Sequence, residues 1–249
     1  MIKPSCKIEL FREESGWGSP AHSLLQQYSK PGYTENEISM RASPEASLAM
    51  IRTLGNQFIP CGGSGAVASA GYQEQVGKNS ALPHAVTVSA ALRPGNVFVT
   101  GASARVFRYG SELECTMSVD EPSAEQRKWF SLMCEAEQVA FSAIEPGREC
   151  SYVDAKVRSY YEKHGICHTR RHHVGHALGL LSHEAPFFDI GGDTVTKPNM
   201  VFGVESGMYI NEFGGFGHSD TLVVTDEWNR IADVLSQRYL KAWSADWEQ

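Results

Sequence analysis

The sequence predicts an α+β fold made of two related halves that face one another. Two observations lead to this prediction: short motifs recur in the same order in both halves, and helical patterns alternate with strand-rich segments. A chain of 249 residues is long enough to bury one substantial core with a small appendage. We expect an N-terminal extension, residues 1–29, followed by a main domain, residues 30–249.

Each half reads as a Pro-Gly turn, a helix, a loop with a histidine, a strand that begins after proline, and a returning strand. The matching segments are Lys30–Gly32 with Glu145–Gly147, Leu82–Ala85 with Leu181–Ala185, and Arg93–Phe98 with Lys197–Phe202. Chance explains one such match more easily than several in the same order. The pattern therefore indicates an internal duplication.

The helices are predicted from polar starts, apolar spacing, and glycine or proline stops. They lie around 21–28, 33–54, 124–144 and 148–164, with a closing amphipathic helix within 229–247. The third helix links the two halves and is the most distinct. Ser123 is a good N-cap, Gln126 completes a capping box, and Pro146-Gly147 ends the apolar pattern.

Two strand-rich segments complete the halves, Asn96–Val119 and Met200–Thr225. Both carry valines among small polar residues, which is typical of strands. The first is expected to turn at Ala102–Ala104. The second is expected to turn at Glu212–Gly217, where glycines permit positive φ. We expect each segment to form a returning pair of strands.

Composition and charge exclude several classes of protein. An apolar content of 42% and a charged content of 20% are typical of a soluble globular protein, and a net charge of −7 argues against nucleic acid. The sequence contains no apolar run long enough to cross a membrane, and residues 1–15 do not read as a secretory signal. The six scattered cysteines favour free thiols and a cytoplasmic location.

Three histidines are candidates for chemistry: His84 and His183, which occupy matching loops, and His176, which has glycine on either side at Gly175 and Gly179. Imidazole moves protons near neutral pH because its ordinary pKa is about 6.5. The alternative is that they are structural histidines that hydrogen-bond the backbone. The neighbouring pair His172-His173 is expected to be a solvated or strand-edge cluster.

Two carboxylates are further candidates. Glu205 follows the apolar run Val201–Val204, where an unpaired charge is costly. A structural salt bridge is the alternative. Glu112 is a candidate for the site on similar grounds. Glu114 lies two residues further along the same strand face, and either carboxylate could enter the site.

The Gly-His and His-Glu-x-Pro motifs at residues 175–186, the strand Val201–Tyr209, and the closing Asp220–Thr225 together resemble the pita-bread (M24-type) family of creatinase, aminopeptidase P and prolidase. The resemblance implies two pseudo-symmetric halves, each with helices and a curved antiparallel sheet. It also implies five metal ligands, Asp, Asp, His, Glu and Glu. The corresponding positions here are Val99–Gly101, Glu112, His176, Glu205 and Ser219.

Two of those five ligands are therefore missing, and a pair of bridged metal ions is not expected. The pattern is similar to creatinase, which works without metal. It implies a metal-independent hydrolase or lyase, without cofactor, that cleaves a C–N bond in a small cationic or amide substrate. Catalysis would fall to His84, His176, His183, Glu205 and Glu112. Substrate binding would fall to Glu112, Glu205, Tyr109 and Ser219.

Two alternatives remain open. One is a mononuclear Xaa-Pro aminopeptidase or prolidase, with Mn, Co or Zn held by Glu112, His176 and Glu205 and with His218 or Asp220 helping. The other is a non-catalytic binding module. Larger members of the family carry an N-terminal domain that shapes the pocket, often across a dimer. Residues 1–29 are expected to be its remnant, and a homodimer is expected.

Overall fold

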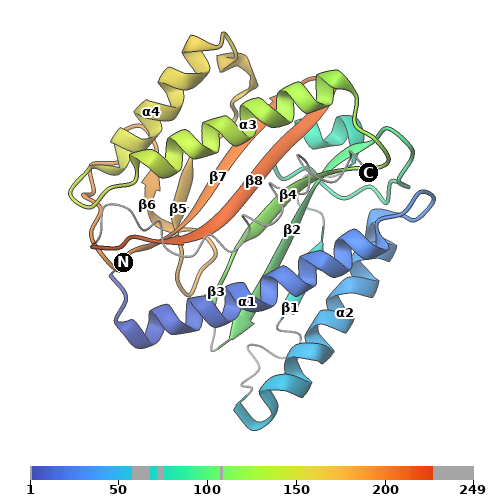
Figure 1. Ribbon diagram of the computed structural model, residues 1–249, viewed down its shortest axis with the longest axis horizontal. Coiled ribbons are helices and arrows are strands. Elements are labelled where there is room, and N and C mark those ends of the chain that lie inside the picture. The colour runs from blue at the N-terminus through green and yellow to red at the C-terminus, as the bar shows by residue number, and fades with distance from the viewer. Residues whose placement is uncertain (1, 58–67, 72–75, 107–108, 227–249) are drawn as a thin grey trace.

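The computed structural model describes residues 2–57, 68–71, 76–106 and 109–226 (Figure 1). Its helices are α1 (Ser5–Tyr28), α2 (Glu35–Leu54), α3 (Ala124–Ala143) and α4 (Cys150–Lys163), with short 3₁₀ helices η1 (Gly55–Gln57), η2 (Gly77–Ala81) and η3 (Cys167–Thr169). Its strands are β1 (Ala68–Gly71), β2 (Val97–Val106), β3 (Tyr109–Gly110), β4 (Leu113–Ser118), β5 (Gly175–Ala177), β6 (Glu184–Phe188), β7 (Val201–Ile210) and β8 (Gly214–Val223). The closing helix predicted within 229–247 lies outside the described residues.

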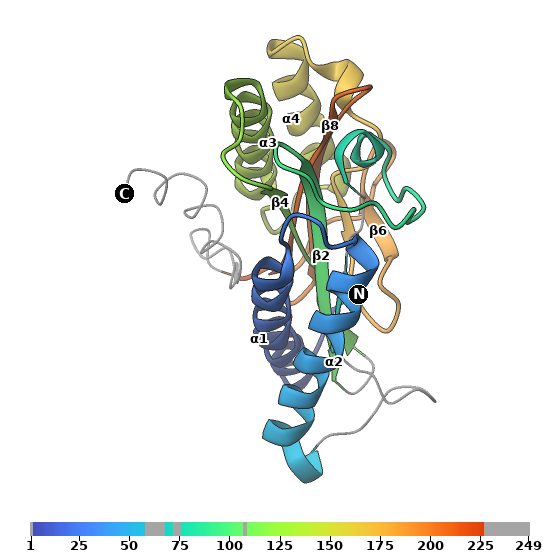
Figure 2. The ribbon, with the colours of Figure 1, turned by 90° about the vertical axis from the view of Figure 1, so that its right-hand side faces the viewer.

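The strands form one antiparallel sheet in the order β1-β2-β4-β8-β7-β5-β6, with β3 paired to β2. Helix α1 lies over the first half of the sheet and α3 over the second, on the same side (Figures 1 and 2). The segment that contains η2, drawn in teal, lies on the opposite side (Figure 2). The two halves meet where β4 pairs with β8. The predicted α+β fold with two pseudo-symmetric halves is confirmed.

The duplication extends to individual backbone hydrogen bonds. Gly95 and Asn199, matched in the sequence, both have positive φ, 80° and 67°. The N–H of Gly95 donates to Val119 O at 2.9 Å, and the N–H of Asn199 donates to Val224 O at 2.8 Å. The turn that precedes β2 and the turn that precedes β7 therefore have matching backbone conformations and hydrogen bonds.

Helix boundaries follow the capping residues. Ser123 and Gln126 form the predicted capping box of α3, and Thr34 forms an equivalent box with Glu37 at the start of α2. The first helix differs from the prediction: α1 has 24 residues, not a short turn around 21–28. Its weak pattern comes from a proline at position 20 and a narrow apolar stripe, of which Leu25 is fully buried.

Helix α1 packs against β2, with Ala21 and Leu25 buried beside Phe98 in the core cluster of the first half. The predicted division into an N-terminal extension, residues 1–29, and a main domain, residues 30–249, stays a prediction.

Strand alternation gives the sheet two different faces. Phe202, Val204 and Phe216 point toward α3, where they pack with Met133 and other residues of the largest core cluster. Burying each such side chain stabilises the fold by about 1.5–3 kcal/mol. The opposite face of β7 and β8 carries glycines and polar side chains, and this is where the candidate site lies.

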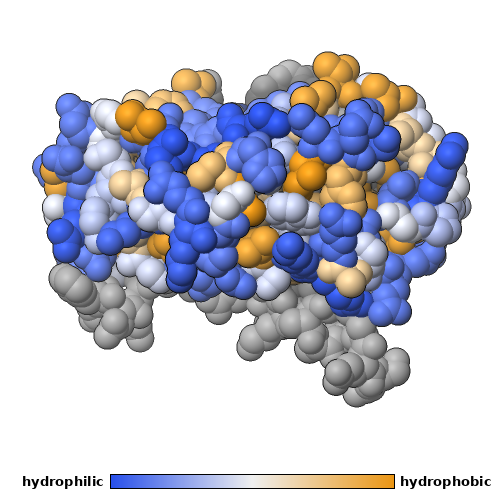
Figure 3. Space-filling view, turned by 90° about the horizontal axis from the view of Figure 1, so that it is seen from above, coloured by the Kyte–Doolittle hydropathy of each residue, from blue (hydrophilic) through white to orange (hydrophobic). Residues whose placement is uncertain are grey.

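None of the described helices has the length and apolarity needed to span a bilayer. The face shown from above in Figure 3 is mostly hydrophilic, with small apolar patches between the polar side chains.

Candidate metal and catalytic centre

Three side chains predicted for the site come together from three parts of the sheet. His176 lies on β5, Glu205 on β7, and Glu112 just before β4, where its N–H donates to Thr221 Oγ1 at 2.8 Å. His176 is the strand partner of Gly203, and the missing side chain of Gly203 leaves room for the side chains of Glu112 and His176. A Cβ there would lie 2.9 Å from Glu112 Oε2. The glycine therefore permits the approach of Glu112 to His176.

His176 lies between the two carboxylates. Its Nε2 is 3.3 Å from Glu112 Oε2 and 3.5 Å from Glu205 Oε1, and its side chain is fully buried. Its Nδ1 lies 3.2 Å from the carbonyl of Ala177, so Nδ1–H donates and Nε2 faces the carboxylates. In the described part of the chain, neither Nε2 nor Glu112 Oε2 has a well-formed hydrogen bond. A proton or a metal ion must lie between His176 Nε2 and Glu112 Oε2, because the lone pairs of these two atoms would otherwise repel one another.

The electrostatics of the group follow from this arrangement. Burial would raise the pKa of Glu112, but the neighbouring His176 outweighs burial and holds that pKa below its usual range. Burial alone would lower the pKa of His176, but Glu112 and Glu205 raise it. The site thus favours a cation between its two carboxylates.

Two further imidazoles extend the site toward solvent. His183 stacks on His176 with ring centroids 4.0 Å apart, and His84 lies 6.2 Å from His183. His84 and His183 are both exposed. The neighbouring atoms still cover part of the His183 ring, and this partial burial lowers its pKa. The structure therefore brings together the matching histidines of the two halves, as the duplication predicts.

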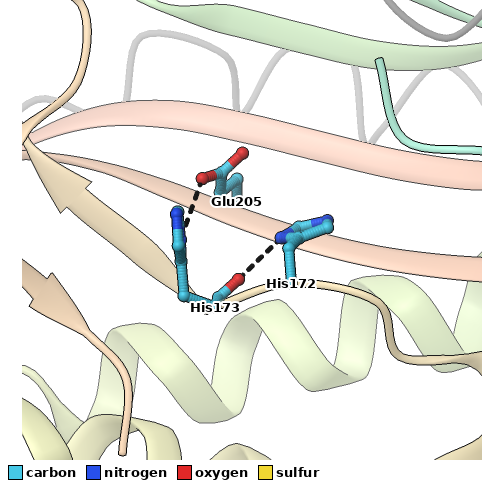
Figure 4. Close-up of side chains that lie close together, drawn as sticks. All are labelled: His172, His173 and Glu205. Atoms are coloured by element: carbon cyan, nitrogen blue, oxygen red, sulfur yellow. Dashed lines mark hydrogen bonds and ion pairs between the residues drawn. The ribbon is translucent and has the colours of Figure 1, made fainter. Parts of the chain in front are cut away.

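His172 and His173, expected as a solvated or strand-edge cluster, lie just before β5 and are half-buried in the wall of the site rather than solvated (Figure 4). His173 Nδ1 lies 3.2 Å from Glu205 Oε1, and His172 Nε2 lies 2.8 Å from the hydroxyl of Tyr209. Burial lowers the pKa of each to about 4, so both are neutral near pH 7. Sequence spacing does not reveal this contact, because it depends on the pairing of β5 with β7.

The two replaced ligand positions can now be assigned. Val99 faces the cleft, since a Cβ on Gly217 would lie 3.4 Å from its Cγ1, whereas Thr100 faces α1, where His22 Nε2 lies 2.6 Å from its hydroxyl. Ser219 is paired with Glu205 and fully buried. Valine offers no ligand atom and serine only a hydroxyl, so carboxylates for a second ion are absent at these two positions.

Tyr109 lies away from this group. Its ring packs 5.3 Å from Phe11 of α1, in a hydrophobic cluster that includes Leu178 and Val201. We therefore leave Tyr109 out of the proposed substrate contacts.

The suggestion that His218 or Asp220 helps to hold an ion in the cleft is wrong. Alternation along β8 turns both side chains to the face opposite Ser219, toward α3. His218 Nδ1 instead lies 2.8 Å from Glu137 Oε1.

The residues present fit one divalent ion. Ligand atoms of His176, His183 and Glu205 all lie within 4.8 Å of one another, and Glu112 reaches the same His176 nitrogen. One or two imidazoles with carboxylates suit Zn, Mn or Co. Two ions sharing bridging carboxylates need more acidic donors than these positions supply.

Comparison with known proteins adds independent findings. The sequence profile of metallopeptidase family M24 matches residues 9–226. The Xaa-Pro dipeptidase of Pyrococcus furiosus is 32% identical over 150 residues, covering 60% of this chain and 43% of the relative. The probable dipeptidase PepE of Mycobacterium tuberculosis is 26% identical over 234 residues, covering 91% of this chain and 57% of the relative.

Solved structures agree on the fold. The prolidase from Pyrococcus furiosus has a TM-score of 0.79 at 24% identity and covers 91% of this chain and 63% of its own. The Xaa-Pro dipeptidase from Bacillus anthracis has a TM-score of 0.78 at 27% identity and covers 90% of this chain and 59% of its own. The chain thus spans about half the length of the curated relatives it matches.

These findings overturn the expectation of a creatinase-like, metal-independent enzyme without cofactor. The matched family is one of metallopeptidases, and the relatives carry the names of dipeptidases and prolidases. The expectation was wrong because it equated the loss of two carboxylates with the loss of all metal. Glu112, His176 and Glu205 remain gathered with no positive side chain other than imidazole among their described ion-pair partners. The predicted hydrolase of C–N bonds agrees with the relatives.

Proposed function

The chain belongs to metallopeptidase family M24, and we propose that it is a peptidase that uses one divalent ion, Mn, Co or Zn, to hydrolyse small peptides of the Xaa-Pro type. One observation carries this proposal: the buried Nε2 of His176 faces Glu112 and Glu205 at 3.3 and 3.5 Å. The names of the relatives support the substrate class.

Glu112, His176 and Glu205 would hold the ion. A divalent ion held there would supply Lewis-acid chemistry for the hydrolysis of a peptide bond. His173 lies on the other side of the Glu205 carboxylate, with its Nδ1 3.2 Å from Glu205 Oε1.

The outer imidazoles handle protons. Cleavage before proline produces a secondary amine, whose nitrogen must be protonated as it leaves. His183 is exposed and stacks on His176, and His84 is the next ring outward. His183 is therefore assigned the transfer of a proton to the leaving nitrogen, and His84 the exchange of that proton with solvent.

The walls beyond Glu205 support binding of a small, partly apolar residue. His172 is held by the hydroxyl of Tyr209, and the ring of Phe187 lies 5.2 Å from that of His173. Because burial keeps His172 and His173 neutral near pH 7, these rings present flat, weakly polar surfaces to a substrate.

We also propose a cytoplasmic homodimer. Each of the five described cysteines is a free thiol, which suits a reducing compartment. Exposed apolar side chains near His84 and His183, among them Val86 and Leu181, support the burial of this rim by a second copy. Sedimentation measured over a range of concentrations tests the dimer.

Metal reconstitution tests the function. Chelator-treated protein should lose hydrolysis of Xaa-Pro dipeptides and regain it with Mn, Co or Zn. His176→Gln should stay inactive with every ion, while His168→Gln, a change at an exposed histidine outside the site, should behave as wild type. Turnover that survives complete chelation, or equal turnover by His176→Gln, would contradict the proposal. Metal binding without turnover would favour a binding module.

A further inference from the structure

A second group of metal-ligating side chains lies on the other face of the sheet, away from the cleft. Glu137 comes from the middle of α3, and His218 and Asp220 come from β8. His218 Nδ1 lies 2.8 Å from Glu137 Oε1 and 3.8 Å from Asp220 Oδ2. The three side chains are at most 2% exposed, so water does not solvate them.

The charges of this group call for a cation. Two carboxylates face one imidazole, so even a protonated His218 offsets only one negative charge. Glu137 Oε2 and His218 Nε2 have no hydrogen-bond partner among the residues that the structure describes.

Softer donors lie next to the group. The thiol of Cys115 on β4 is buried and interacts electrostatically with His218, and that of Cys134, one turn before Glu137 on α3, interacts with Glu137. Thiols, imidazole and carboxylates together favour zinc over magnesium or calcium.

We propose that Glu137, His218 and Asp220 form a second metal site, closed to solvent, that takes a divalent transition ion of the zinc type and joins α3 to β8. Their ligand atoms all lie within 4.8 Å of one another, a spread compatible with donors around one ion. A dication would balance both carboxylates and leave His218 neutral. Binding would therefore displace the proton by which His218 Nδ1–H donates to Glu137.

The role of this site is structural. A bound substrate cannot reach it, because the sheet lies between it and the cleft and its side chains are buried. The ion would tie the linking helix to the central strand at the junction of the two halves. The inference does not depend on the proposed peptidase function.

Counting metal in variants separates the two sites. The double variant His176→Gln/Glu205→Gln, grown with added zinc and dialysed without chelator, should retain one ion per chain by mass spectrometry, against two in the wild type. Adding His218→Gln to this background should remove the remaining ion. A retained ion in the double variant supports the site without requiring the His218 variant to fold.

Thermal unfolding supplies the second readout. Strong chelator should lower the midpoint of the double variant, because its remaining ion holds α3 to the sheet. A double variant with no ion and no chelator response would overturn the inference while leaving the cleft proposal intact. A wild type with one ion, lost only on His218→Gln, would support the inference and contradict the cleft proposal. An ion that persists after His218→Gln in the double-variant background would overturn the inference.

Discussion

Gly203→Ala should weaken metal binding in the cleft without unfolding the chain. A Cβ at residue 203 would lie 2.9 Å from Glu112 Oε2 and 3.3 Å from Cε1 of His176. Since carbon contacts are most favourable at about 3.5–4.0 Å, the Glu112 carboxylate must move by roughly 0.5–1 Å. Displacements of this size cost on the order of 10²-fold in rate, and disturbed ligand support costs about 10–100-fold in metal affinity.

The stability change should be small by comparison. Overpacking costs about 1–3 kcal/mol, and the reduced entropy of the unfolded chain returns about 0.4–1 kcal/mol. Calorimetric titration of chelated protein with Mn or Zn measures affinity, and denaturant unfolding of the same samples measures stability. Gly16→Ala is the matched control, because a Cβ there would meet no atom within 4 Å. Wild-type affinity in Gly203→Ala would refute the reasoning that Gly203 sets the position of Glu112.

Three further outcomes are expected. Burial, with a smaller contribution from His218, lowers the pKa of His22 in the folded chain to about 4. In the unfolded chain His22 takes up a proton as the pH falls below about 6.5, so the free energy of unfolding should fall by up to about 3 kcal/mol between pH 6.5 and 4. His22→Gln should flatten this part of the pH–stability curve. His183→Ala should reduce kcat by about 10²–10⁴-fold with metal content unchanged within a factor of a few, and His84→Ala should reduce it less; equal effects in steady-state kinetics would count against the assigned order of proton transfer. Phe202→Ala, at a fully buried position, should cost about 3–5 kcal/mol in denaturant unfolding, and a loss below 1 kcal/mol would contradict its place in the core.

The sequence was most informative where a local rule determines the structure. The capping box at Ser123 and the matched turns at Gly95 and Asn199 depend on nearby residues, so their patterns could be read directly. Helix α1 was underestimated because its apolar stripe is narrow and interrupted by polar residues. Its length is stabilised by packing on β2, which no local pattern expresses.

The candidate site was only partly predictable, for the same reason. Glu112, His176, His183 and Glu205 could be identified from motifs. The approach of His173 to Glu205 depends on which strands are neighbours. The segment before β5 lies beside β7, where the N–H of Glu205 donates to Val174 O at 2.8 Å. The distinction between Ser219 and His218 also depends on strand register, because a shift of one residue moves a side chain to the other face.

Anomalous diffraction from crystals grown with manganese tests the central claim most directly. The account predicts a peak between Glu112 and Glu205, next to Nε2 of His176, that disappears in crystals of His176→Gln. Crystals with saturating manganese that show no anomalous density beside His176 would contradict it.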